Sequence, residues 1–250
     1  MEWKDYAYKI RELLGLKGNA VAITYSMKPP SISVEGKYQV CKAFLHARNG
    51  EVINLTTSTC SCPGGIWQLG LAEPPKGDLD KAQKEFLVNG EKLYCSITTY
   101  YRARTLSVTP PLGLADNIIL SPMDKAEFRP DIILFICNAE QACRLVTLDI
   151  YNTGIPPRIE MSGSTCHQAV AYPIVTGELN VSLMDYTSRR IRGYNKEELL
   201  VSIPYHRFIG IIRSIDHCTA GLAKMEVPES FRRLAGTNAQ QDLERLDQEL

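Results

Sequence analysis

The residues best suited to chemistry in this sequence are its eight cysteines. Four of them, Cys41, Cys60, Cys62 and Cys166, fall at predicted strand-to-helix junctions or helix starts. Unpaired backbone N–H groups and the helix dipole stabilise an anion at such places. A thiol there loses its proton more readily, and the thiolate binds metal or attacks a substrate. These four cysteines are therefore candidate metal ligands or nucleophiles.

The spacing of these cysteines matches no compact metal motif. The CxxC pairs of a zinc ribbon and the CxxCxxC run of bacterial ferredoxins are both absent from the sequence. Cys60 and Cys62 are two residues apart, so their side chains diverge in an extended chain, and one of the two is the stronger candidate ligand. Gly64 and Gly65 follow at once and allow a bulky ligand to approach the backbone. Any metal site must therefore draw ligands from distant segments.

The other four cysteines fall on apolar faces of predicted strands or helices. Free cysteine is among the most buried residue types. We therefore predict that these four pack in the core: Cys95, Cys137, Cys143 and Cys218.

Basic residues near the second half of the chain suggest an anion site. Arg189 and Arg190 lie in the cluster SRRIRG, and arginine grips carboxylate or phosphate with two parallel hydrogen bonds. A solvated turn is the alternative interpretation of this cluster. Tyr100, Tyr101, Arg102 and Arg104 are candidates to extend the same pocket, with ordinary surface and core positions as the alternative. His167, next to Cys166, is placed to orient or protonate a ligand, unless it is a surface residue at a helix start.

Several familiar catalytic motifs are missing. The sequence contains no GxSxG, HExxH, GxGxxG or Walker A motif. Nucleotide binding and the common hydrolase mechanisms therefore have no support from sequence motifs.

The elements that must position these residues alternate irregularly between strand and helix. This pattern predicts an α/β (mixed α+β) fold with a central mixed sheet, flanking helices and a C-terminal helical segment. We expect one domain over residues 1–235 and a charged helical tail over residues 236–250. The predicted strands cover residues 20–26, 51–57, 93–101, 116–120, 130–137, 158–162 and 178–185, and residues 197–205 form a further strand or a short helix. The predicted helices cover residues 3–14, 41–48, 79–88, 138–151, 164–177 and 208–225.

Composition excludes several classes of protein. Lys plus Arg and Asp plus Glu each number 28, and this balance argues against nucleic acid as a partner. No apolar run approaches the roughly 20 residues that a membrane helix needs, so we expect no membrane partner. The N-terminal segment MEWKDYAYKI is charged and lacks the apolar stretch of a secretion signal. We therefore expect a cytoplasmic protein with reduced thiols.

Several of these stretches together resemble a known family. They are Cys41 with Ala47 and Gly50, the element CPGGIWQLG at residues 62–70, PDIILFICNAEQACRL from Pro130, the Cys166 element, and TGELNVSLMDYTSRR followed by ELLVSIP. They resemble the uncharacterised "domain of unknown function 169" proteins of archaea and anaerobic bacteria. The resemblance implies that Cys62, rather than Cys60, occupies the recurring position. It leaves Cys41, Cys62 and Cys166 as the shared set and implies no particular reaction.

Our leading expectation is a protein with an iron–sulfur or related metallocofactor. Cys41, Cys62 and Cys166 would hold a 4Fe–4S cluster, with the fourth iron open or held by Cys60 or a non-protein ligand. An open iron acts as a Lewis acid toward a small anionic molecule.

Two other functions remain open at this point. One is a metal-free cysteine enzyme with Cys62 as nucleophile and His167 as base. The other is a non-catalytic ligand-binding or assembly module. A second copy of the chain and a redox partner protein are the macromolecular partners that we consider.

Overall fold

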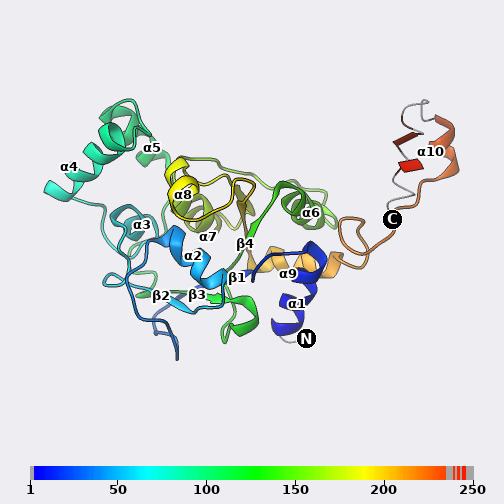
Figure 1. The fold of residues 1–250 in the computed structure, drawn as a ribbon, viewed down its shortest axis with the longest axis horizontal. Coiled ribbons are helices and arrows are strands. Elements are labelled where there is room, and N and C mark those ends of the chain that lie inside the picture. Colours follow the sequence, from blue (N-terminus) through cyan, green and yellow to red (C-terminus); the bar gives the residue numbers. More distant parts are fainter. Residues whose placement is uncertain (1–2, 235–238, 240, 243, 246–250) are drawn as a thin grey trace.

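Six strands form a single antiparallel sheet in the computed structural model, which describes residues 3–234, 239, 241–242 and 244–245. The strand order is β2-β3-β1-β4-β6-β5, and every neighbouring pair is antiparallel (Figure 1). The strands are β1 (Val21–Ser26), β2 (Ile53–Leu55), β3 (Asn117–Pro122), β4 (Ile132–Cys137), β5 (Asn180–Ser182) and β6 (Leu199–Pro204). The α/β class is confirmed.

The sheet is not mixed as the sequence pattern suggested. Its parallel contact is an isolated bridge between Tyr38 and Cys60, outside the six strands. Apolar content reports the burial of a strand and not its direction, so the pattern carried no information on this point.

The middle of the sheet is buried on both faces. All six residues of β4 are buried, and alternate residues join two separate core clusters. Strand side chains point alternately to opposite faces, so a strand covered on both sides is apolar throughout. On one face lie Ile132, Leu134 and Ile136, and on the other Ile133, Phe135 and Cys137.

Helices cover the two faces and make a three-layer structure. The helices on one face are α1 (Trp3–Leu14), α6 (Ala139–Ile150) and α9 (Tyr205–Ser214), which share a core cluster. The helix α2 (Val40–Arg48), the π-helical turn η3 (His167–Ala171) with α7 (Tyr172–Thr176), and the segment around α8 (Tyr186–Ile191) cover the other face. A short 3₁₀ turn, η2 (Met123–Lys125), follows β3.

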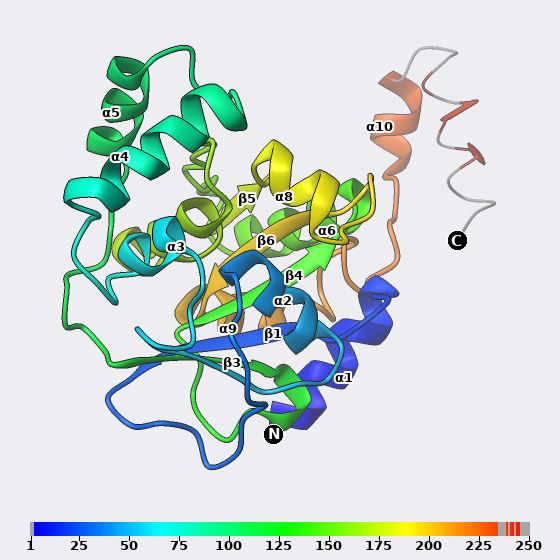
Figure 2. The same cartoon turned by 60° about the vertical axis from the view of Figure 1, so that its left-hand side comes forward.

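A group of helices stands at one end of the molecule. Figures 1 and 2 both show α3 (Pro63–Gln68) between the body of the sheet and the pair α4 (Gly77–Glu85) and α5 (Ile97–Leu106). A π-helical turn, η1 (Phe86–Gly90), continues α4. The helix α10 (Glu229–Leu234) projects from the opposite side. Among the described helices, none combines the length and apolar character needed to cross a bilayer.

Three predicted elements differ from the structure. The predicted strand at residues 93–101 is wrong, because Ser96 caps α5 by accepting a hydrogen bond from the Thr99 backbone N–H at 3.2 Å. Such a cap favours a helix despite the β-branched and aromatic residues that follow. Residues 158–162 form no regular element. The predicted helix at residues 208–225 is shorter, since α9 ends at Ser214.

Two of the cysteines predicted to lie in the core are on the surface. Cys137 and Cys218 are buried, whereas Cys95 and Cys143 are exposed. The prediction for Cys95 assumed that it lies on the apolar face of a strand, and its segment is not a strand. The helical tail predicted at residues 236–250 falls largely outside the described residues and stays a prediction.

Candidate functional site

Three cysteines from distant segments line one cavity. The cavity has a volume of about 450 Å³, and its lining includes Cys41, Cys62 and Cys166. They come from α2, from the cap of α3 and from the residue before η3. The structure therefore brings together three of the four predicted cysteine ligands.

Cys62 is held at the start of α3 by the backbone. Its Sγ accepts a hydrogen bond from the Gly65 N–H at 3.3 Å, and Pro63 occupies the first turn, where a missing N–H does no harm. Burial nevertheless raises the pKa of the Cys62 thiol, although the N–H groups of Gly65 and Gly64 act to lower it. Thus the acidic thiol expected from its position is wrong for Cys62, because desolvation outweighs the helix start.

Cys166 lies deepest of the three. Burial raises the pKa of its thiol well above the ordinary value, and the charges of Cys62, Cys41 and Cys60 raise it further. Charge on a neighbouring thiolate disfavours a further negative charge on Cys166. The expectation of an easily ionised Cys166 is therefore wrong for the protein without a bound cation.

Cys41 is tied to the segment that carries α8. The Tyr194 hydroxyl donates a hydrogen bond to the Cys41 carbonyl oxygen at 2.6 Å. Burial raises the pKa of the Cys41 thiol, while a hydrogen bond with Ser188 lowers it. The α8 segment thus helps to position this thiol beside the cavity.

A hydrogen-bond network fixes the start of η3 and so the place of Cys166. The Asp185 carboxylate accepts from the Ser188 N–H at 2.7 Å, which caps α8, and from the Thr165 hydroxyl at 2.6 Å. The Ser164 hydroxyl donates to the Gln68 side chain at 2.6 Å. Residues on either side of the cavity are therefore linked through the residues that precede Cys166.

Cys60 does not line the cavity. Its thiol faces the carbonyl oxygen of Cys62 at 3.8 Å, and burial raises its pKa to about 11.

The two arginines predicted to bind an anion lie elsewhere. Arg189 donates to the carbonyl oxygens of Leu183 at 3.1 Å and Glu198 at 2.7 Å, and also to that of Lys196. Arg190 is exposed and stacks over Tyr186. Neither is among the lining residues of the thiol cavity. Arg192, from the same sequence cluster, does line the cavity.

His167 points into the protein and not into the cavity. It is fully buried, its Nδ1 lies 3.1 Å from the Ser162 hydroxyl, and burial lowers its pKa. His167 is not among the residues that line the cavity with Cys62. Gly64 and Gly65, by contrast, both line the cavity as expected for a close backbone approach.

Several residues that line the cavity were not among the candidates from the sequence. Tyr100 and Arg104 from α5 line the cavity and had been considered, but Trp67, Gln83 and Asp185 had not. Trp67 follows Gly65 on α3, so its presence beside the thiols was readable in the sequence. Gln83 lies on a predicted exposed helix and gave no sequence signal.

Two π-helical turns border this cavity. η3 begins directly after Cys166, and Phe86 and Leu87 of η1 are lining residues. Such turns are rare and frequently lie at functional sites.

Comparison with known proteins places the chain in a family. The model of the family DUF169, described as "Uncharacterised ArCR, COG2043", matches residues 9–214. The chain belongs to this family. An uncharacterized protein of Methanocaldococcus jannaschii, MJ0308, is 26% identical over 231 residues, which cover 86% of this chain and 94% of the relative. No solved structure matches the chain.

The DUF169 match confirms the resemblance inferred from the sequence. It spans the three cavity cysteines and all six strands, and it ends with α9. The cavity is therefore a feature of the DUF169 part of the chain.

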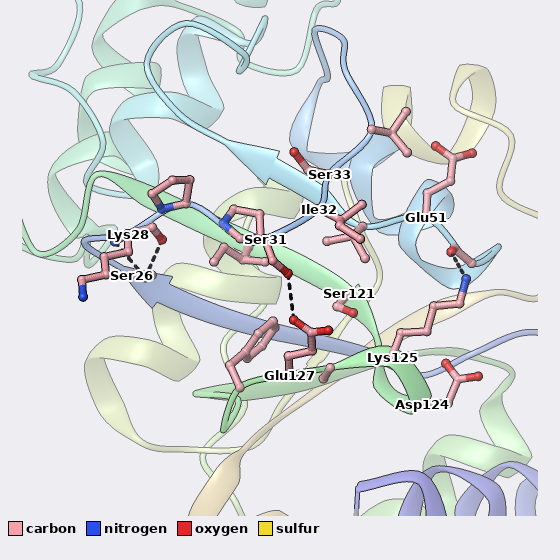
Figure 3. Close-up of a pocket in the computed structure, with 18 of the residues that line it drawn as sticks. Ser26, Lys28, Ser31, Ile32, Ser33, Glu51, Ser121, Asp124, Lys125 and Glu127 are labelled. Carbon is pink, nitrogen blue, oxygen red and sulfur yellow. Dashed lines mark hydrogen bonds between the residues drawn. The ribbon is translucent and has the colours of Figure 1, made fainter.

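A larger cavity, of about 1230 Å³, is a weaker candidate for chemistry. It lies beside the segment that follows β1, and some of its polar groups pair with one another or with the backbone (Figure 3). The Ser31 hydroxyl donates to Glu127 at 2.8 Å, and the Lys125 ammonium donates to the Gly50 carbonyl oxygen at 2.7 Å. Among the described residues that line it, none is a cysteine or a histidine.

Proposed function

We propose that this protein binds an iron–sulfur cluster of the 4Fe–4S type through the thiolates of Cys41, Cys62 and Cys166. The observation that carries the proposal is that these three thiols, from three distant segments, line one cavity. Thiolate sulfur is the usual protein ligand of such clusters. A cytoplasmic location, where thiols stay reduced, is part of this proposal.

The raised pKa values give a physical reason for a bound cation. Burial raises the pKa of all three thiols, the charge of Cys62 raises that of Cys41, and the charges of Cys62 and Cys41 raise that of Cys166. Ionising all three without a counter-charge is costly in this environment. Iron supplies that counter-charge and replaces the thiol protons, so binding releases protons.

We propose a cluster rather than a single metal ion for this cavity. Over the part of the chain that the structure describes, no group of three or more His, Cys, Asp or Glu side chains is arranged to hold a metal ion. The ligands of one tetrahedral ion converge on it at about 2.3 Å, whereas the ligands of a cubane bind separate irons. Thiols that share a cavity without converging on one point are compatible with the second case.

A small anionic molecule is the ligand we propose for the open side of the cluster. Three thiolates leave one iron of a cubane without a protein ligand, and that iron acts as a Lewis acid when the cluster is bound. Arg192 and Arg104 line the cavity and supply positive charge. They take the role that the sequence had suggested for Arg189 and Arg190.

A metal-free cysteine enzyme has less support. A nucleophilic thiol needs a lowered pKa or an adjacent base. Burial raises the pKa of Cys62, and the lining residues of its cavity do not include His167.

The test is anaerobic reconstitution of the full chain with iron and sulfide, followed by an absorption spectrum and metal analysis. We expect broad absorption near 400 nm and about four irons and four sulfides per chain. Cys41→Ser, Cys62→Ser and Cys166→Ser should each lose most of the bound iron. Circular dichroism and thermal unfolding show whether each variant is folded.

Cys60→Ser is the matched control, because Cys60 is also buried but does not line the cavity. We expect it to keep the absorption and the iron of the wild-type protein. A wild-type protein that stays colourless after reconstitution, or iron binding that survives in all three cavity variants, would overturn the proposal.

A further inference from the structure

The thiol cavity also contains polar groups with nothing to bind. The indole N–H of Trp67 and the amide oxygen of Gln83 are buried atoms without a hydrogen-bond partner among the described residues, and the buried hydroxyl of Tyr100 lies beside Arg104. All three residues line this cavity. Trp67 is 7% exposed and Tyr100 5% exposed, so solvent does not readily serve as the partner. An unpaired buried polar group destabilises the protein, and a bound molecule that pairs with it recovers that loss.

These groups sit together on the wall formed by α3, α4 and α5. A Cβ added to Gly64 would stand 3.0 Å from Gln83 Nε2, which places the Gln83 amide against the start of α3. The Arg104 guanidinium lies over the Trp67 ring, 4.8 Å from its centre. One face of the indole is therefore covered, and the N–H at the ring edge is left to donate. Burial raises the pKa of Tyr100, so its hydroxyl keeps its proton.

The rest of this wall is apolar and partly exposed. Leu79 is 53% exposed and Phe86 55% exposed, and both line the cavity. The rings of Tyr94 and Tyr100 meet edge to face, with centres 5.7 Å apart. Large apolar side chains left exposed around a cavity are typical of a ligand site. The wall thus offers flat apolar surface together with one donor and one acceptor.

We propose that this wall binds a planar heteroaromatic molecule through a lactam edge. A ring carbonyl accepts from the Trp67 N–H, and the neighbouring ring N–H donates to the Gln83 amide oxygen. The faces of the ring pack against the apolar side chains, and the Tyr100 hydroxyl supplies a further hydrogen bond. A hydrocarbon leaves both polar groups unpaired, and a carboxylate offers no donor to Gln83. The lactam edge satisfies both groups at once.

This proposal shares the cavity with the iron–sulfur cluster but does not depend on it. The lactam contacts involve α3, α4 and α5 side chains and none of the cysteines. Binding is therefore measured on the metal-free protein, so that failure of one proposal leaves the other intact.

The experiment is isothermal titration calorimetry of the full metal-free chain with lumazine, hypoxanthine and lumichrome. We expect at least one of these planar lactams to bind with a Kd below about 100 µM. Trp67→Phe and Gln83→Leu should each weaken that binding about tenfold, as expected for one lost hydrogen bond. Gln83→Glu keeps a hydrogen-bond acceptor at this position. Its Kd should therefore stay within about threefold of the wild-type value.

Three controls separate recognition from general damage. Where lumazine binds, 1,3-dimethyllumazine, which lacks the ring N–H groups, should bind about tenfold more weakly. Tyr101→Phe should leave binding unchanged, whereas Tyr100→Phe should weaken it, since Tyr101 does not line the cavity. Cys166→Ser should retain lactam binding while it loses iron.

Either of two results would overturn the proposal. One is that none of the three lactams binds with a Kd below about 1 mM. The other is that Trp67→Phe and Gln83→Leu, shown to be folded by circular dichroism, bind the same lactam as tightly as the wild-type protein.

Discussion

Gly65 and Cys166 approach each other so closely that the glycine has no room for a side chain. A Cβ on Gly65 would stand 3.2 Å from Cys166 Sγ and 2.7 Å from Val40 Cγ2. The second distance is shorter than real Cβ contacts allow. Glycine is required here because there is no space for a side chain. The backbone conformation imposes no such requirement, since Gly65 is not among the residues of positive φ.

Gly65→Ala should disturb both the fold and the thiol site. The added methyl group must push Val40 or Cys166 aside, and overpacking of this kind costs about 1–3 kcal/mol of unfolding free energy. We expect that loss in urea unfolding, together with a clear fall in iron retained after reconstitution. Gly64→Ala is the matched control, since its Cβ would meet only the end of the Gln83 side chain, at 3.0 Å. Equal iron retention in the two variants would contradict the importance of this contact.

Thiol reactivity should follow exposure in the metal-free protein. Cys95 and Cys143 are exposed, and a hydrogen bond from Thr99 lowers the pKa of Cys95. Burial raises the pKa of Cys62 and Cys166, so few thiolates form there. We expect iodoacetamide to modify Cys95 and Cys143 at least about tenfold faster than the cavity thiols. Peptide mass spectrometry after timed quenching measures this directly.

The contrary result would have a clear meaning. If Cys62 reacts first, its thiol is activated in a way that burial alone does not allow, and the metal-free enzyme becomes the better hypothesis. The double variant Cys95→Ser, Cys143→Ser provides the control, since its remaining reactivity comes from the other cysteines.

The sequence predicted the central strands well because their apolar pattern is set by burial. The run IILFIC became β4, buried on both faces, and residues 3–14 became α1. Strand direction was not predictable, since it depends on how distant segments are connected. The predicted strand at 93–101 failed because one serine cap at Ser96 outweighed the composition of nine residues.

The candidate site was predictable in part. Cys41, Cys62 and Cys166, each at or beside a helix start, share a cavity because the segments that carry them pack together over one face of the sheet. Their ionisation was predicted in the wrong direction, since the sequence shows the helix start but not the depth of burial that raises the pKa. The contribution of Gln83 depends on how α4 packs against α3, which no local pattern reports.

The buried thiol of Cys60 should make the metal-free protein less stable at high pH. Burial raises its pKa from 9.0 to about 11, so the unfolded chain releases this proton at a lower pH than the folded chain. The protonated thiol therefore contributes its full stability below pH 9.0, and that contribution is lost as the pH rises toward about 11. The loss is on the order of 2 kcal/mol. The Cys60→Ala substitution removes this pH-dependent loss of stability.

Urea unfolding at pH 8, 9, 10 and 11 provides the measurement. The free energy of unfolding of the wild-type protein should fall more steeply over this range than that of Cys60→Ala. Loss of packing in Cys60→Ala adds an offset that does not change with pH, so the slope isolates the titration of the thiol. Cys143→Ala serves as the second reference, because this exposed thiol is free of the burial that acts on Cys60. A gap between wild type and Cys60→Ala that stays constant from pH 8 to 11 would show that burial does not raise the Cys60 pKa.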